Sequence, residues 1–103
     1  MTREAGEKAL AECRDRINEL DRQLTDLLNA RTRIVHEIGR IKAECGMRIY
    51  EPKREEEVLA NVQAHNAGPM ADDAVRRIFE RIIDEMRTLQ RLRMESTRDG
   101  DKG

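Results

Sequence analysis

The sequence contains few aromatic residues, prolines and glycines, which are common in the strands and turns of β-sheet proteins. It has no tryptophan, and Tyr50 and Phe79 are its two aromatic residues. Two prolines and six glycines are too few turn signals for a fold built from many short strands. Apolar runs are two or three residues long, and no apolar signal segment follows the charged N-terminus. These shortages exclude an all-β fold, predict no membrane-spanning segment and favour a cytoplasmic protein.

The residue groups that carry metal and nucleophilic chemistry are also missing. His36 and His65 have no cysteine or acid at a zinc-ligand spacing, and there is no glycine-rich phosphate loop. Cys13 and Cys45 would lie about 48 Å apart on one helix, too far for a disulfide within it. We therefore predict no metal site, and we interpret both cysteines as small buried residues in a reducing compartment.

Charge is abundant but balanced. Twenty lysines and arginines face 21 aspartates and glutamates, so the 103-residue chain has a formal net charge of -1. No global positive field favours binding to nucleic acid, and any anion site must be local. A chain of this length forms one domain, and with 40% charged residues it can bury little surface by itself.

Apolar residues recur at alternating spacings of three and four through residues 8–45, which is typical of a helical heptad seam. The seam comprises Leu10, Cys13, Ile17, Leu20, Leu24, Leu27, Ile34, Ile38, Ile41 and Cys45. Such a helix, ended by Gly46, would be about 57 Å long. A compact chain of this size has a radius of gyration of about 13 Å. We therefore expect the helix to pack against a second copy of the chain.

Two shorter helices are expected after this one. Pro52 suits the first position of a helix that ends before Gly68, and Asp72 suits the start of another. Their apolar faces comprise Val58, Leu59, Val62, Ala71, Val75, Ile78, Phe79, Ile82, Ile83, Met86 and Leu89. The predicted fold is all-α, with a long, a short and a medium helix. Residues 8–95 would form the domain, between flexible ends at 1–7 and 96–103.

Two cations interrupt the long seam. Arg31 fills a seam position, and Lys42 lies about 20° from it on a helical wheel. They could fix the register or extend their charged ends to water, but an unpaired buried charge is costly, so together they indicate an anionic ligand. Arg14 lies about 25 Å from Arg31 along the axis. It is either a flanking coiled-coil charge or a residue that serves another chain's ligand.

Three further residues stand out beside the apolar faces. Glu55 precedes Leu59 by four residues, where a helix cap or a surface ion pair would explain it as well as a ligand contact. Gln90 continues the apolar face of the last helix. Its amide either forms hydrogen bonds within the protein core or donates a hydrogen bond to a ligand. Gly39 costs its helix about 1 kcal/mol relative to alanine. Either a close approach of another group or simple tolerance of a glycine in the helix would explain it.

These residues resemble the all-helical class of chorismate mutases over about residues 10–92. The resemblance is carried by three segments: CRDRINELDRQLTDLLNARTRIVHEIGRIK, EPKREEEVL and IFERIIDEMRTLQ. It implies an intertwined homodimer with two active sites, which rearranges chorismate to prephenate in phenylalanine and tyrosine biosynthesis. Because that reaction is intramolecular, it implies no cofactor.

The resemblance also assigns roles by position. Arg14 would come from the other subunit, Arg31 would bind a substrate carboxylate, and Arg54 would line the site wall. Lys42 would contact a carboxylate and the ether oxygen, to which Gln90 would also donate.

Three more positions belong to the same expected site. Glu55 would accept a hydrogen bond from the substrate's ring hydroxyl, with Glu51 nearby where relatives often carry aspartate. Met86 stands where some relatives have a small polar residue beside a substrate carboxylate.

Two alternatives stay open. An isochorismate pyruvate-lyase would use a similar cationic pocket on the same scaffold. A non-catalytic helical dimerisation module would explain the seam but would leave Arg31 and Lys42 without anions. The sequence neither favours nor excludes docking onto another shikimate-pathway enzyme.

Overall fold

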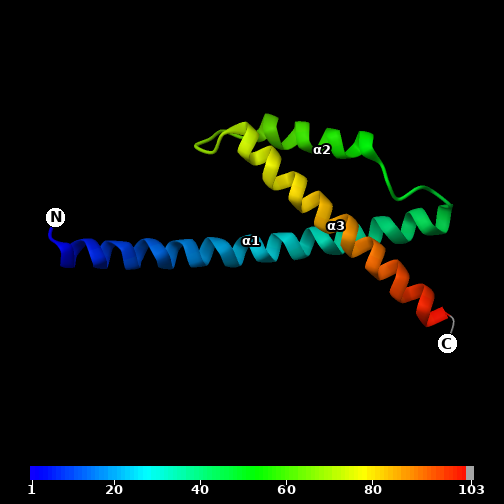
Figure 1. Cartoon of the computed structure of the whole chain (residues 1–103), viewed down its shortest axis with the longest axis horizontal. Helices are drawn as coiled ribbons and strands as arrows, with labels where there is room; N and C mark the ends of the chain where they lie inside the picture. The colour runs from blue at the N-terminus through cyan, green and yellow to red at the C-terminus, as the bar shows by residue number, and fades with distance from the viewer. Residues whose placement is uncertain (102–103) are drawn as a thin grey trace. The chain divides into compact units, whose positions relative to one another are not determined.

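The structure is a computed structural model that describes the backbone of residues 1–101 and the side chains of residues 1–96. It contains the helices α1 (Arg3–Cys45), α2 (Pro52–His65) and α3 (Asp72–Asp101), with no strand in the described range (Figure 1). The predicted all-α fold with a long first helix is confirmed. Both outer helices run further than expected, from Arg3 and to Asp101. Residues 102–103 of the expected flexible tail lie outside the described residues.

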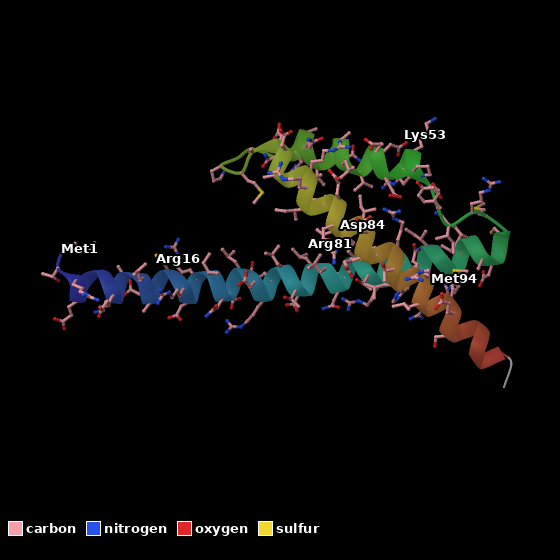
Figure 2. All side chains as sticks on the ribbon, viewed as in Figure 1. Met1, Arg16, Lys53, Arg81, Asp84 and Met94 are labelled. Atoms are coloured by element: carbon pink, nitrogen blue, oxygen red, sulfur yellow. The ribbon has the colours of Figure 1, made fainter. Side chains whose placement is uncertain are left out.

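The chain divides into two units, residues 1–34 and 35–103. The first unit is the N-terminal part of α1, which begins where the hydroxyl of Thr2 accepts a hydrogen bond from the amide of Ala5 at 3.1 Å. Such a bond satisfies one of the free amides of a helix start. Charged side chains project along this part of the helix, Arg16 among them (Figure 2).

The apolar seam of the first unit is uncovered. Its large side chains are 53–67% exposed, and α1 has no buried residue. These side chains belong to Leu10, Ile17, Leu20, Leu24 and Leu27. The expectation that Cys13 and Cys45 are buried is wrong for the single chain, where both are exposed. For Cys13 the physical reason is that the first unit is a lone helix, whose seam has nothing to pack against.

The second unit holds the end of α1, α2 and α3. Gly46, with φ +66°, ends α1 as predicted. The amide of Met47 donates to the carbonyl of Lys42 at 2.8 Å, and that of Gly46 donates to Ala43 at 3.4 Å. This pair of bonds is the Schellman arrangement, which satisfies the last carbonyls of a helix and turns the chain sharply. Pro52 then begins α2, also as predicted.

α2 and α3 pack on each other after a short turn. The side-chain amide of Asn66 bridges the turn. Its Nδ2 donates to the main-chain carbonyl of Met70 and to the carboxylate of Asp72, at 2.7 Å each. Arg76 of α3 bonds both carboxylate oxygens of Glu56 on α2 at 3.2 Å. The buried side chains of the described residues are Leu59, Ile83 and Met86. Within the part of the chain that the structure describes, no helix is long and apolar enough to cross a bilayer.

Candidate functional site

The eight predicted site residues divide between the two units. Arg14 and Arg31 belong to the first unit, where Arg14 is exposed and Arg31 half-buried. About 25 Å of helix separates them, more than an arginine side chain can span. The second unit holds the other six, Lys42, Glu51, Arg54, Glu55, Met86 and Gln90.

Lys42 is a half-buried cation with two partners in the loop that follows α1. Its side chain is 15% exposed and forms an ion pair with Glu51. Its Nζ also donates to the carbonyl of Ile49 at 3.3 Å. The chain reversal at Gly46 folds the following loop back over the last turn of α1 and so supplies both partners. The geometry shows that a carboxylate can reach this ammonium group.

The two predicted acids are held by partners that the local sequence did not identify. Glu51 stands at the N-cap of α2 but makes no side-chain capping bond, since its carboxylate pairs with Lys42. Glu55 is neither a cap nor half of a local surface pair. Its side chain is 24% exposed and its Oε1 lies 3.3 Å from Nη2 of Arg87 on α3.

Arg54 pairs with an acid of its own helix. Its Nη1 pairs with Glu57, one turn further along α2, at 3.3 Å, and both side chains are exposed. The structure therefore does not bring Arg54 onto Lys42 or Glu55. An exposed pair of this kind contributes at most about 1 kcal/mol, so it holds Arg54 weakly.

Gln90 reaches α1 from α3. Its Nε2 donates to the main-chain carbonyl of Val35 at 3.2 Å. A Cβ added to Gly39 would lie 3.4 Å from the same nitrogen, at the edge of ordinary van der Waals contact, so Gln90 lies beside Gly39. A side-chain amide has two N–H donors. One is engaged by Val35, which leaves the second available to a ligand.

Met86 is a core residue. It is buried, as are Leu59 of α2 and Ile83 of α3. A thioether has no hydrogen to donate to a carboxylate. Its position is therefore better explained by packing than by a polar substrate contact.

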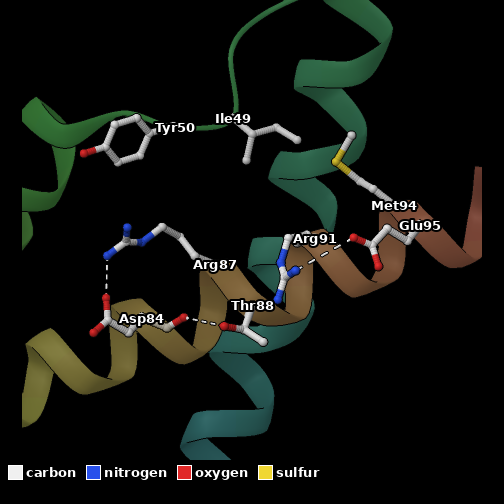
Figure 3. Close-up of a pocket in the computed structure, with 8 residues that line it drawn as sticks. All are labelled: Ile49, Tyr50, Asp84, Arg87, Thr88, Arg91, Met94 and Glu95. Carbon is white, nitrogen blue, oxygen red and sulfur yellow. Dashed lines mark hydrogen bonds and ion pairs between the residues drawn. The ribbon is translucent and has the colours of Figure 1, made fainter.

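A cavity of about 590 Å³ lies between α3 and the loop before α2 (Figure 3). Ile49 and Tyr50 line it from the loop, and α3 lines it between Asp84 and Glu95. None of the eight predicted residues is among those that line it. Among the described residues, no group of three or more histidine, cysteine or acidic side chains is placed to hold a metal ion.

Arg87 lines this cavity but is not among the site residues that the sequence predicted. It follows Met86 off the apolar stripe of α3, where an arginine is normally interpreted as a solvated surface charge. No pattern within α3 distinguishes it from Arg81 or Arg91. Its contact with Glu55 depends on the packing of α2 against α3, which no local signal reveals.

Comparison with known proteins agrees with this fold. Residues 13–91 match the family model for chorismate mutase type II. The structure of chorismate mutase (form II) from Thermus thermophilus gives a TM-score of 0.78 at 37% identity, covering 81% of this chain and 94% of that one. The chorismate mutase of Methanocaldococcus jannaschii is 27% identical over 94 residues, which cover 90% of this chain and 95% of the relative.

Longer relatives match over a part of their length. The bifunctional chorismate mutase/prephenate dehydratase of Neisseria gonorrhoeae is 35% identical over 78 residues, or 76% of this chain and 21% of the relative. This chain thus spans about a fifth of such bifunctional proteins. Because the family model covers most of the chain and the three-helix fold is shared, this chain is a chorismate mutase domain and belongs to the type II, all-helical family.

Proposed function

We propose that this domain rearranges chorismate to prephenate, a step of phenylalanine and tyrosine biosynthesis. The observation that carries the proposal is the enclosed ammonium group of Lys42 with a carboxylate bound to it. Chorismate is a small dicarboxylate, so it can replace Glu51 as the partner of Lys42. A substrate carboxylate would then take the place that the Glu51 carboxylate holds in the free chain.

The chemistry asks little of the protein beyond placement and charge. The rearrangement is pericyclic and intramolecular, so it needs no nucleophile and no proton transfer. The site must hold the enolpyruvyl group folded over the ring, and it must stabilise the negative charge that develops on the ether oxygen. Lys42 and the second N–H of Gln90 are the donors we assign to that oxygen.

The substrate's other polar groups would be bound by the remaining predicted residues. Arg31 and Arg54 would bind carboxylates, since a planar guanidinium can bind a carboxylate through two hydrogen bonds. The weak exposed pair with Glu57 would release Arg54 for this purpose. Glu55 would accept the ring hydroxyl, with Glu51 beside it. Met86 would contact substrate only as an apolar wall.

We also propose that the domain acts as an intertwined homodimer. The uncovered seam of the first unit needs a complementary apolar surface of equal length, and a second copy of the same helix offers one. Arg14 is exposed on that unit and too far from Arg31 to share its ligand. It would therefore complete the partner's site.

Three wider features belong to the same proposal. Residues 8–95 would form the catalytic domain. Docking onto another shikimate-pathway enzyme is supported by relatives that carry a prephenate dehydratase in the same chain. A cytoplasmic location is the third, as expected of an enzyme of amino-acid biosynthesis.

The decisive experiment offers the purified protein chorismate and isochorismate in separate incubations. We expect loss of chorismate absorbance with appearance of prephenate. Cleavage of isochorismate with no action on chorismate would instead make the domain a pyruvate-lyase. If neither compound reacts and a chorismate-like dicarboxylate does not raise the melting temperature, the domain is a dimerisation module, since a ligand of the folded state must stabilise it.

A further inference from the structure

Arg87 links the start of α2 to the middle of α3. Its Nη2 lies 3.3 Å from Oε1 of Glu55, and the same guanidinium pairs with Asp84 one turn earlier on α3. Of these two acids, Glu55 is the less exposed. A guanidinium presents five N–H donors in a fixed plane, so it can serve two carboxylates at once.

The loop before α2 adds a third contact to Arg87. The guanidinium carbon lies 5.8 Å from the centroid of the Tyr50 ring, within the range of a cation–π interaction. Figure 3 shows Arg87 extending from α3 between Tyr50 and Asp84. Arg87 thus contacts the loop, α2 and α3, although its side chain is 45% exposed.

The value of this arrangement lies in orientation more than in stability. Partly exposed ion pairs contribute little to folding. A glutamate in the first turn of a helix, however, has several freely rotating bonds, and fixing one carboxylate oxygen removes most of that freedom. An ionised carboxylate has lone pairs for about four hydrogen bonds, so a Glu55 held by Arg87 through Oε1 still offers Oε2 to another donor.

We infer that Arg87 is a positioning residue, which holds the Glu55 carboxylate where it accepts the ring hydroxyl of the substrate. The inference rests on the proposed function, because it concerns the role that Glu55 has in that reaction. It adds to the site a residue from α3 that acts through Glu55 and does not bind the substrate directly.

The test is a double-mutant cycle between Arg87→Met and Glu55→Gln, with kcat and KM measured for chorismate. Methionine keeps the bulk of the arginine stem and removes the charge. We expect Arg87→Met to lower kcat/KM about 10-fold or more, since small displacements of substrate-orienting groups are costly. The decrease in kcat and the increase in KM should be in the same proportion for Arg87→Met as for Glu55→Gln. In the Glu55→Gln background the same change should cost less than about 2-fold.

Two further variants separate positioning from a structural effect. Arg87→Lys keeps a cation beside Glu55 and should restore most of the lost activity. Arg91→Met removes the arginine one turn further along the same cavity, where it pairs with Glu95 at 3.9 Å, and it should leave kcat and KM unchanged. If Arg87→Met does not fold, as judged by circular dichroism, Tyr50→Leu removes the support of Arg87 and should couple to Glu55→Gln in the same way.

The outcomes distinguish this inference from the proposed function. A wild-type protein that does not convert chorismate overturns both. An active wild-type protein whose Arg87→Met variant is fully active overturns the inference alone. So does a loss that is equally large in the Glu55→Gln background, because the two residues would then act independently.

Discussion

The side-chain amide of Gln90 donates to the main-chain carbonyl of Val35 at 3.2 Å. In an α-helix this carbonyl also accepts the amide of the residue four positions later, which is Gly39. Gly39 lies directly beside this bond, where an added Cβ would touch the Gln90 amide at 3.4 Å. The glycine that costs α1 some stability therefore leaves one side of the proposed ether-oxygen donor free of a contact.

Replacing this glycine should separate stability from activity. Gly39→Ala should lower kcat several-fold, since its Cβ would touch the Gln90 amide at 3.4 Å and restrict where that amide can lie. The same change should hold or raise the melting temperature, because alanine favours a helix by about 1 kcal/mol over glycine. Gly6→Ala, in the same helix but away from the site, is the control and should stabilise without loss of activity. A fully active Gly39→Ala variant would show that the open side of Gln90 is not needed for turnover.

Removing the ammonium group of Lys42 should abolish most turnover. Loss of one preorganised donor to a developing charge costs about 100- to 1,000-fold in kcat. Lys42→Ala should show this loss in a chorismate assay while circular dichroism shows unchanged helix content. Lys53→Ala removes an exposed cation at the start of α2 and should leave kcat/KM near the wild-type value. A Lys42→Ala variant with near-normal kcat/KM would exclude the proposed site.

Gln90→Glu should make kcat depend on pH, with higher turnover at acidic pH. An ionised carboxylate cannot donate to the ether oxygen, so turnover at neutral pH should fall about 100-fold or more. Turnover should rise again as the pH falls through the pKa of the new carboxyl. That pKa is ordinarily about 4.3, and we expect it to be raised here because the group would face the Val35 carbonyl. The pH profile of kcat checks this, and Gln90→Ala should show no recovery in acid.

Complementation should reveal a site shared between chains. Arg14→Ala and Arg31→Ala should each inactivate the homodimer. After equal amounts exchange subunits, half of the dimers are hybrids, and one of the two sites in each hybrid has both arginines. Activity should therefore recover to about a quarter of the wild-type value. Arg16→Ala, a neighbouring exposed arginine, should remain active throughout. Verified exchange without recovery would mean that each site is built from one chain.

A charge placed in the uncovered seam should break the dimer. Leu24 is 57% exposed in the single chain, and we expect it to be covered by the second copy. Leu24→Glu should sediment as a monomer and melt at a lower temperature. The wild-type melting temperature should rise with protein concentration, as it does when association stabilises folding. Asn18→Glu adds the same charge beside the seam and should remain dimeric. A monomeric wild-type protein would refute the dimer.

The extent of each helix was largely predictable because helices depend on local signals. Gly46 and Pro52 mark the ends of α1 and α2 as expected, since a left-handed glycine and a helix-starting proline act within one turn. The additional turns at both ends of the chain were not predicted. They lie in polar segments such as residues 96–101, where no apolar periodicity marks a helix.

By itself the sequence determined three helices, their apolar faces and the positions where charge interrupts those faces. Only the tertiary structure decided which partners those charges have: Glu51 for Lys42, and Arg87 for Glu55. The physical reason is the range of the interactions. Helix formation and capping are settled within about four residues, whereas an ion pair between α2 and α3 depends on how the two helices pack.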